Sequence, residues 1–121
     1  MDEFAILERI QRRVLWLSTW MVHHANFVRP NPDGTKVGGH QASSSSIVGL
    51  LTALYFHALR PDDLVAVKPH AAPAFYAIQY LRGRLPKTAL AELRSFGGLQ
   101  AYPSRRRNPA IVDLSTGSMG L

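Results

Sequence analysis

The chain of 121 residues contains no cysteine. This absence excludes a disulfide framework, a thiolate metal site and a cysteine nucleophile. The sequence opens with Met1, Asp2 and Glu3, which are neutral or acidic where a secretory signal would be basic. Its longest apolar run, around 47–59, is far shorter than a membrane span and contains His57. These features favour a cytoplasmic protein without a membrane segment.

Acidic residues are also few, because 8 Asp and Glu stand against 14 Lys and Arg and leave a formal net charge of +6. A basic balance permits binding to nucleic acids or other anionic surfaces. The positive charge is scattered, however, except at Arg105, Arg106 and Arg107, and aromatic residues do not alternate with that run as a stacking platform requires. The preferred interpretation of the run is a solvated loop, and a small basic nucleic-acid-binding module is the alternative.

Hydrophobic periodicity and turn residues predict four helices and two short strands. Helices are expected at 3–25, 44–59, 73–81 and 86–96, and strands at 64–67 and 111–114. The apolar strand candidates are typical of a parallel sheet buried on both faces. The alternation predicts an α/β fold, namely part of a three-layer parallel-sheet domain with a long N-terminal helix.

A loop rich in proline and glycine, at 29–39, divides the chain into two expected parts. Residues 1–39 would form the N-terminal helix and loop, and residues 40–121 the first part of the sheet domain. Two strands are few for a self-contained sheet, and the chain stops at Leu121, where a helix should begin. The sequence therefore predicts a domain that is truncated at its C-terminus.

Three short stretches place glycine, histidine or small hydroxyl residues where a strand or loop should pass into a helix. They read Gly-Gly-His-Gln-Ala-Ser at 38–43, Lys-Pro-His-Ala-Ala-Pro-Ala-Phe-Tyr-Ala at 68–77 and Ser-Thr-Gly-Ser-Met-Gly-Leu at 115–121. Such junctions leave N–H groups without partners, and these groups can bind a phosphate. Three of them in one short chain favour a diphosphate cofactor.

The ordered set of motifs resembles the N-terminal region of the thiamine diphosphate enzymes of the transketolase superfamily. The likeness is greatest to the homodimeric type of pyruvate dehydrogenase decarboxylating (E1) component. Its Leu-Glu-Arg-x-Gln-x-Arg helix is similar to residues 7–13, its Tyr-Ala-x-x-x-Leu-x-Gly-Arg-Leu segment to residues 76–85, and its Gly-Leu-x-x-Tyr-Pro segment to residues 98–103. No single motif is specific, but their order is.

The resemblance implies a cofactor site built from several motifs. In that superfamily the histidine and serine of the first motif lie near the diphosphate and thiazolium, which implies these roles for His40 and Ser43. The histidine after the first strand reaches the diphosphate or the reacting carbon, which implies that His70 is catalytic together with His40. Gly117 and Met119 would flank the aminopyrimidine. Imidazoles suit these roles because they can donate hydrogen bonds to phosphate oxygens and to a developing oxyanion.

Lys68 departs from the pattern, because the pyruvate dehydrogenase family often has glutamine two residues before the second histidine. A lysine there could pair with the diphosphate or with a substrate carboxylate, so Lys68 joins the expected cofactor-binding residues. The departure leaves the substrate open. Decarboxylation of a 2-oxo acid such as pyruvate is the first expectation, and transketolase-type ketol transfer on sugar phosphates is the alternative.

The family's metal motif, Gly-Asp-Gly followed at a distance by Asn, does not occur in this sequence. The ligands of Mg²⁺, which normally ties the diphosphate to the protein, are therefore expected outside this chain. The glutamate that activates the aminopyrimidine lies in a separate domain of the family. We therefore expect this chain alone to be inactive, with a homodimer or a partner subunit supplying the rest of the site.

Overall fold

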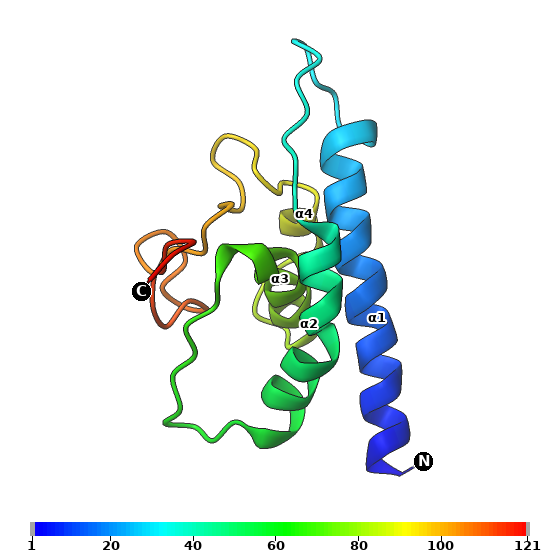
Figure 1. Ribbon diagram of the computed structural model, residues 1–121, viewed down its shortest axis with the longest axis vertical. Helices are drawn as coiled ribbons and strands as arrows, with labels where there is room; N and C mark the ends of the chain where they lie inside the picture. Colours follow the sequence, from blue (N-terminus) through cyan, green and yellow to red (C-terminus); the bar gives the residue numbers. More distant parts are fainter. Residues whose placement is uncertain (1, 121) are drawn as a thin grey trace.

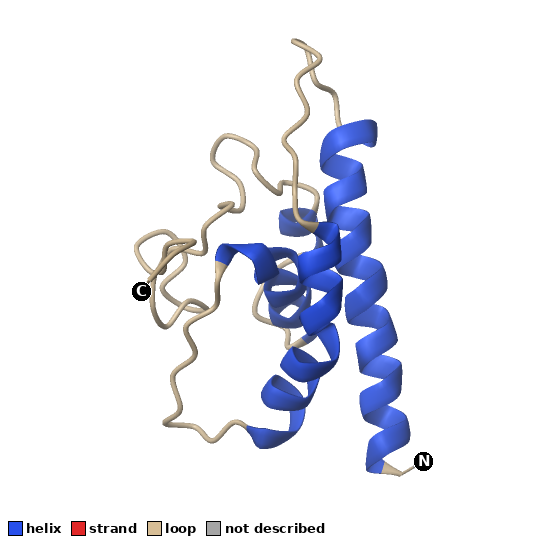
Figure 2. Cartoon of the chain, viewed as in Figure 1, coloured by secondary structure: helices blue, strands red, loops and turns tan. Residues whose placement is uncertain are grey.

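The computed structural model describes residues 2–120 as helices joined by long loops (Figures 1 and 2). The α-helices are α1 (Glu3–His23), α2 (Gln41–Ala53), α3 (Ala72–Leu81) and α4 (Lys87–Leu90). The shorter turns are the π-helical η1 (His24–Val28) and η2 (Leu54–Ala58) and the 3₁₀ turn η3 (Pro69–Ala71). Leu121, on which the expected C-terminal truncation depends, lies outside the described residues.

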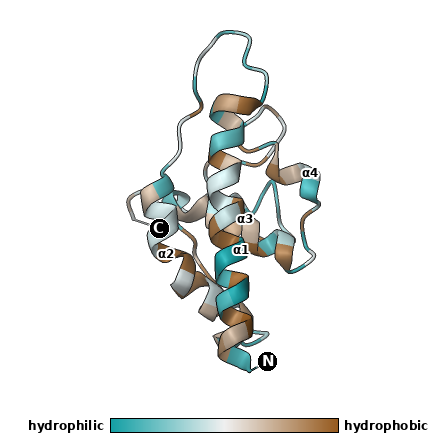
Figure 3. Ribbon diagram, turned by 90° about the vertical axis from the view of Figure 1, so that its right-hand side faces the viewer, coloured by the Kyte–Doolittle hydropathy of each residue, from teal (hydrophilic) through white to brown (hydrophobic). Residues whose placement is uncertain are grey.

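The first helix, α1, begins at Glu3 because Asp2 caps it: the Asp2 carboxylate accepts a hydrogen bond from the N–H of Ala5 at 2.8 Å. Its buried residues are Val14, Leu17, Ser18, Met21 and Val22. The exposed Trp16 stacks with Trp20, which packs against the core, and their ring centroids lie 6.4 Å apart. Hydrophobic and hydrophilic residues alternate along the helix (Figure 3). No helix in residues 2–120 is both long enough and apolar enough to cross a bilayer.

Both long helices end in a π-helical turn. The N–H of Arg29 donates to the carbonyl of His24 at 2.8 Å, and the N–H of Leu59 donates to the carbonyl of Leu54 at 2.9 Å. The backbone becomes extended at Arg29 and at Leu59. The predicted helices at the start of the chain and after the proline-rich loop are therefore present, although the second begins at Gln41 rather than at residue 44.

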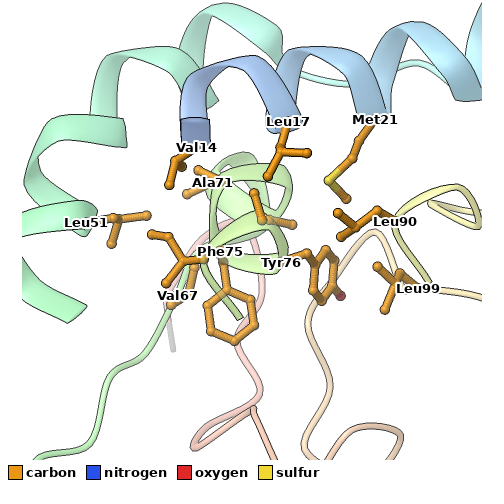
Figure 4. Packing of buried hydrophobic residues seen from close by; sticks show 14 of the residues in the cluster. Val14, Leu17, Met21, Leu51, Val67, Ala71, Phe75, Tyr76, Leu90 and Leu99 are labelled. Atoms are coloured by element: carbon orange, nitrogen blue, oxygen red, sulfur yellow. The ribbon is translucent and has the colours of Figure 1, made fainter. Parts of the chain in front are cut away.

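The third helix, α3, forms the centre of the hydrophobic core (Figure 4). Every residue at 72–79 is buried. The side chains packed around it come from α1, α2 and α4, and include Val14, Leu17, Met21, Leu51 and Leu90. Both expected parts of the chain thus contribute to one core, while the division at residue 39 stays a prediction.

The predicted α/β fold is wrong for the described residues, because neither 64–67 nor 111–114 forms a strand (Figure 2). In the part of the chain that the structure describes, the backbone pairing of β type is a single isolated bridge between Leu93 and Leu99. The architecture is helical, and the expected parallel sheet is not formed.

Side chains take the place of a sheet ladder between the two strand candidates. The carboxylate of Asp113 accepts a hydrogen bond from the N–H of Val65 at 3.0 Å, and the hydroxyl of Thr116 donates to the carbonyl of Val67 at 3.0 Å. A sheet becomes stable only when several strands pair over a shared apolar face, and two short segments do not provide this. The two apolar runs are therefore linked by side chains and do not pair as strands.

The helix expected at 86–96 is shorter than predicted, since α4 ends at Leu90. Beyond it the chain turns back, and the N–H of Arg94 donates to the carbonyl of Leu99 at 2.8 Å. Arg94 has a φ of 60°, which lies outside the right-handed helical region. Its guanidinium donates to the carbonyl of Val37 at 2.7 Å and so fastens the loop before α2 to this turn.

Two tyrosines beside the core have raised pKa values. Tyr76 is fully buried, its hydroxyl donates to the carbonyl of Gln100 at 2.7 Å, and burial raises its pKa. Burial, with a smaller contribution from Asp113, raises the pKa of Tyr55 from 10.0 to about 12, against the opposing charge of Arg82. Both hydroxyls therefore keep their protons at pH values where an exposed tyrosine ionises.

We expect the free energy of unfolding to fall as the pH rises from about 10 to about 12. In this window the unfolded chain has released the Tyr55 proton and the folded chain still holds it. Because the folded state binds more protons, raising the pH lowers its stability relative to the unfolded state. Tyr55→Phe should flatten the decline, and the exposed Tyr102→Phe should not. Urea unfolding at several alkaline pH values measures the slope, and equal slopes in Tyr55→Phe and the unaltered chain would contradict the prediction.

Candidate functional site

His40 and His70 belong to different motifs, and the fold brings them together. His40 occupies the cap position of α2 without a side-chain capping bond, and His70 lies in η3. Their rings meet edge to face, with centroids 4.8 Å apart and planes inclined by 67°. Within residues 2–120 neither imidazole has a hydrogen-bond or ion-pair partner. Because His40 is exposed and His70 is partly exposed, their ring nitrogens are available to a ligand.

The C-terminal motif lies near the segment that leads into α3 (Figure 1). Hydrogen bonds join the two segments. The ammonium of Lys68 donates to the carbonyl of Gly117 at 3.2 Å and also to the carbonyl of Gly120. The hydroxyl of Thr116 donates to the carbonyl of Val67 at 3.0 Å and is buried. The three motifs singled out in the sequence therefore lie near the first residues of α2 and α3.

The serine nominated from the first motif, Ser43, is exposed on the first turn of α2. The neighbouring Ser44 is buried, and its hydroxyl accepts a hydrogen bond from the N–H of Ala74 at 3.2 Å. Ser44 thus joins the beginnings of α2 and α3, the two helices that follow the histidines. It was not nominated from the sequence, although its spacing of four residues from the buried Val48 places both on one helical face.

Gly39, directly before His40, has no room for a side chain. Its φ is 140°, and a Cβ there would lie 2.8 Å from a methyl carbon of Val22 on α1. The neighbouring Gly38 donates its N–H to the side-chain oxygen of Asn26 at 2.9 Å and accepts at its carbonyl from the side-chain nitrogen of Asn26 at 2.9 Å. These backbone contacts fix the path of the chain into the first histidine.

We expect Gly39→Ala to lower the free energy of unfolding by about 1–3 kcal/mol, because the new methyl group meets Val22 and the φ favours glycine. The change should also move the His40 ring relative to His70. Gly34→Ala is the matched control, since Gly34 has a φ of 71° but a Cβ there meets nothing within 4 Å. Urea unfolding and the NMR signals of the imidazoles measure both effects. Equal losses in the two variants would show that the contact with Val22 does not matter.

The last motif contributes mainly backbone groups. A Cβ at Gly117 would meet only the carbonyl of Met119, at 3.5 Å, so space alone does not demand glycine there. The Gly117 carbonyl accepts from Lys68, and the Met119 side chain is 90% exposed. The roles of Gly117 and Met119 beside an aminopyrimidine stay a prediction.

The donors around the two histidines suit an anion better than a metal. The two imidazoles, which have no hydrogen-bond partner among the described residues, and the ammonium of Lys68 can all donate hydrogen bonds to phosphate oxygens. Within residues 2–120 no group of three or more His, Asp and Glu side chains could hold a metal ion. Mg²⁺ requires oxygen ligands, and those near the histidines do not supply a set. The described residues therefore fit the diphosphate of a cofactor and do not fit its magnesium ion.

Comparison with known proteins places this geometry in context. No family model matches the chain. The chain is 35% identical, over 129 aligned positions, to the pyruvate dehydrogenase E1 component of Mycolicibacterium smegmatis, with 94% of this chain and 13% of that protein covered. It is 30% identical to the pyruvate dehydrogenase E1 component of Haemophilus influenzae, with 98% of this chain and 14% of that protein covered. It is 33% identical to mouse transketolase, with 68% and 15% covered.

These matches cover the segment in which the sequence motifs occur in order. They include two kinds of enzyme, and the chain spans only 13% to 15% of the length of the three relatives named above. Identity of 30% or more over almost the whole chain indicates common ancestry with the E1 components. The chain is therefore related, along nearly all of its length, to a segment of the enzymes of the transketolase superfamily, as its ordered motifs predicted.

Proposed function

We propose that this chain supplies part of a thiamine diphosphate site in a pyruvate dehydrogenase E1-like enzyme acting on a 2-oxo acid. The observation that carries the proposal is the pair of imidazoles of His40 and His70, whose ring centroids lie 4.8 Å apart where two motifs meet and which have no hydrogen-bond partner among the described residues. The magnesium ligands would come from residues outside this chain, and a second copy or a partner subunit would supply the rest of the active site. The cytoplasmic location expected from the sequence is part of the same proposal.

Each nominated residue has a defined task in this proposal. His40 and His70 donate to diphosphate oxygens and can hold or release a proton at the oxygen of the reacting carbonyl. The ammonium of Lys68 has three donors, of which Gly117 and Gly120 use two, so one is left for an anion. When bound, thiamine diphosphate supplies the carbon nucleophile for a 2-oxo substrate.

Three further residues have roles beside the histidine pair in this proposal. The hydroxyl of Ser43 lies on the first turn of α2, where helix N–H groups and the positive end of the helix dipole also favour an anion. Gly117 and Met119 would offer backbone groups to the aminopyrimidine. These assignments follow from the resemblance of the two motifs to those of the superfamily, and ligand titration tests them.

The 2-oxo acid reaction is preferred over ketol transfer on sugar phosphates because of how the chain matches its relatives. The E1 components align with 94% to 98% of the chain, and mouse transketolase with 68%. The transketolase match is the observation that keeps ketol transfer as the second candidate. Assaying a reconstituted enzyme with pyruvate and with a ketose phosphate separates the two reactions.

Nucleic-acid binding gains no support from the arrangement of the arginine run. The Arg105 side chain donates to the carbonyl of Asp113 at 2.9 Å, and its N–H donates to the hydroxyl of Ser115 at 2.8 Å. These bonds fasten the loop to its own chain. Of the run, only the exposed side chains of Arg106 and Arg107 then remain to contact a nucleic acid, and two arginines form a small basic surface.

Titration of the 121-residue chain with thiamine diphosphate, followed by the NMR signals of its imidazoles, tests the proposal. We expect the signals of His40 and His70 to shift at ligand concentrations of about 1 mM, since weak binding is all that a partial site can provide. Thiamine without phosphates should leave them unchanged. Adding Mg²⁺ should not strengthen binding to this chain, because its described residues form no metal site.

The matched variants are His70→Ala and His57→Ala. His57 pairs with Glu3 at 2.6 Å at the opposite end of the α2–η2 segment from His40, so its loss should leave binding intact. His70→Ala should abolish the shift at His40. Binding that survives in His70→Ala, or shifts confined to other parts of the chain, would overturn the assignment.

A further inference from the structure

A second polar site lies at the C-terminal end of α3. There a cavity of about 370 Å³ is enclosed by the end of η2, the turn that follows it, the turn after α3 and the segment around Asp113. Its charged and hydroxyl-bearing lining residues are Tyr55, Arg60, Asp63, Arg82, Arg84 and Asp113. His70 lies in η3, directly before the other end of α3, so the helix, roughly 15 Å long, separates this cavity from the histidine pair.

The charge of Asp113 acts on one of the three arginines that line the cavity, Arg82, and works to raise its pKa. Within residues 2–120, Arg60, Arg82 and Arg84 form no ion pair. Two carboxylates line the same cavity, but both already accept backbone hydrogen bonds: Asp63 from the N–H of Arg60 at 2.9 Å, and Asp113 from the extended segment before η3 at 3.0 Å. Three arginines against two aspartates leave a formal excess of one positive charge in the lining.

Arg82 is held in place by its neighbours. Its guanidinium carbon lies 5.2 Å from the centre of the Tyr55 ring, and one of its nitrogens donates to the side-chain oxygen of the buried Gln79 at 3.3 Å. Burial, followed by the charge of Arg84, lowers the pKa of Arg82, as expected for two cations near each other. Positioned guanidinium groups lose little entropy when they bind an anion.

Helix capping does not account for these arginines. The last carbonyls of α3 accept hydrogen bonds from the backbone N–H groups of Arg82, Gly83 and Arg84, each at 2.9 Å. The side chains of Arg82 and Arg84 are therefore not required to satisfy the end of the helix. Satisfying the end of the helix therefore does not explain why both arginines line this cavity.

We propose that this cavity binds a phosphate group through Arg60, Arg82 and Arg84. A planar guanidinium group can donate two parallel hydrogen bonds to two oxygens of one phosphate. Three guanidinium groups from two separate segments can surround a tetrahedral anion. The neutral hydroxyl of Tyr55 can add one donor. The cavity volume leaves room for a small organic group attached to the phosphate. This site is independent of the one proposed for thiamine diphosphate.

The test is a titration of the 121-residue chain with sodium phosphate at constant ionic strength and at a pH where inorganic phosphate is mainly the dianion. The arginine side-chain NMR signals report the occupied residues. We expect saturable shifts at Arg82 and Arg84, and none with sodium acetate or sodium chloride at the same ionic strength. Absent shifts, or equal shifts with acetate, would overturn the proposal.

Variants separate the cavity from general charge effects. Arg84→Gln should weaken phosphate binding by at least about tenfold, because a charge-assisted hydrogen bond to the anion is lost. Arg84→Lys keeps the positive charge but loses the planar pair of donors. It should therefore bind phosphate more tightly than Arg84→Gln and more weakly than the unaltered chain. Arg106→Gln, an exposed arginine of the loop, should bind as the unaltered chain does. Equal losses in Arg84→Gln and Arg106→Gln would reduce the effect to net charge and would refute the site.

Two further comparisons identify the source of the phosphate and separate the two proposed sites. Tighter binding of glycerol 3-phosphate than of inorganic phosphate assigns the cavity to a phosphorylated small molecule, and the reverse order assigns it to free phosphate. His70→Ala should retain the phosphate shifts at Arg82 and Arg84. Loss of those shifts in His70→Ala would show that the anion binds at the histidines and would overturn the cavity site.

Discussion

Replacing His70 by alanine is expected to lower turnover by roughly 100-fold in an E1 component whose matching segment has been exchanged for this chain. The imidazole lies 4.8 Å from that of His40 and has no partner within the described residues, so it is free to stabilise charge that develops during the reaction. An interaction made mainly in the transition state lowers kcat and leaves KM nearly constant. Steady-state kinetics with pyruvate, on the exchanged enzyme with and without the substitution, give both constants.

The control for this experiment is His57→Ala in the same exchanged enzyme. It removes an imidazole of the same size at a distance from the candidate site, and the pair it breaks, with Glu3, is exposed and contributes little stability. Circular dichroism should show that all variants remain helical. A kcat that is unchanged in His70→Ala, or lowered equally in His57→Ala, would remove His70 from the reaction.

Phe75→Ala is expected to lower the free energy of unfolding by about 3–5 kcal/mol. Phe75 is 2% exposed on α3, and its ring lies 6.1 Å from that of Tyr55 and 5.5 Å from that of Tyr76 (Figure 4). Removing the ring leaves a cavity in the centre of the core, since α3 is surrounded by the other helices. The free energy of unfolding of a natural domain is about 5–15 kcal/mol in total, so the variant should be close to unfolding.

Urea unfolding followed by circular dichroism measures this loss. Phe96→Ala is the matched control, because the Phe96 side chain is fully exposed and its truncation should change stability by no more than about 0.5 kcal/mol. Phe75→Leu should lose less than Phe75→Ala because most of the volume is kept. If Phe75→Ala is no less stable than Phe96→Ala, α3 is not the centre of the core.

The helices could be predicted from the sequence because their signals are local. Asp2 before an apolar repeat with helical spacing fixes the start of α1, and Pro73 and Gly83 bracket α3. The strands could not be predicted in the same way, since a strand exists only when a distant segment pairs with it. The runs that contain Val65 and Asp113 have strand composition, but the backbone of the first is bonded by side chains, and the second begins in a turn of its own backbone.

The same distinction applies to the candidate site: local motifs identify single residues, and the packing of distant segments decides which of them meet. His40 and His70 were nominated from motifs, but their separation depends on how the ends of α2 and α3 pack, which no spacing in the sequence specifies. Ser44 differs from the nominated Ser43 only by the side of the helix on which it lies. Arg60 and Arg84 are 24 positions apart (84 − 60) and share a cavity only because η2 ends beside α3.

Both tryptophans of the chain, Trp16 and Trp20, stack on the same side of α1, and Trp20 also stacks on His24 with ring centroids 4.7 Å apart. Trp16 is 59% exposed. The intrinsic fluorescence of this protein therefore comes from one strip of its surface. Any association that covers the strip should shift the emission to shorter wavelength, so that binding of a further subunit can be followed without a label.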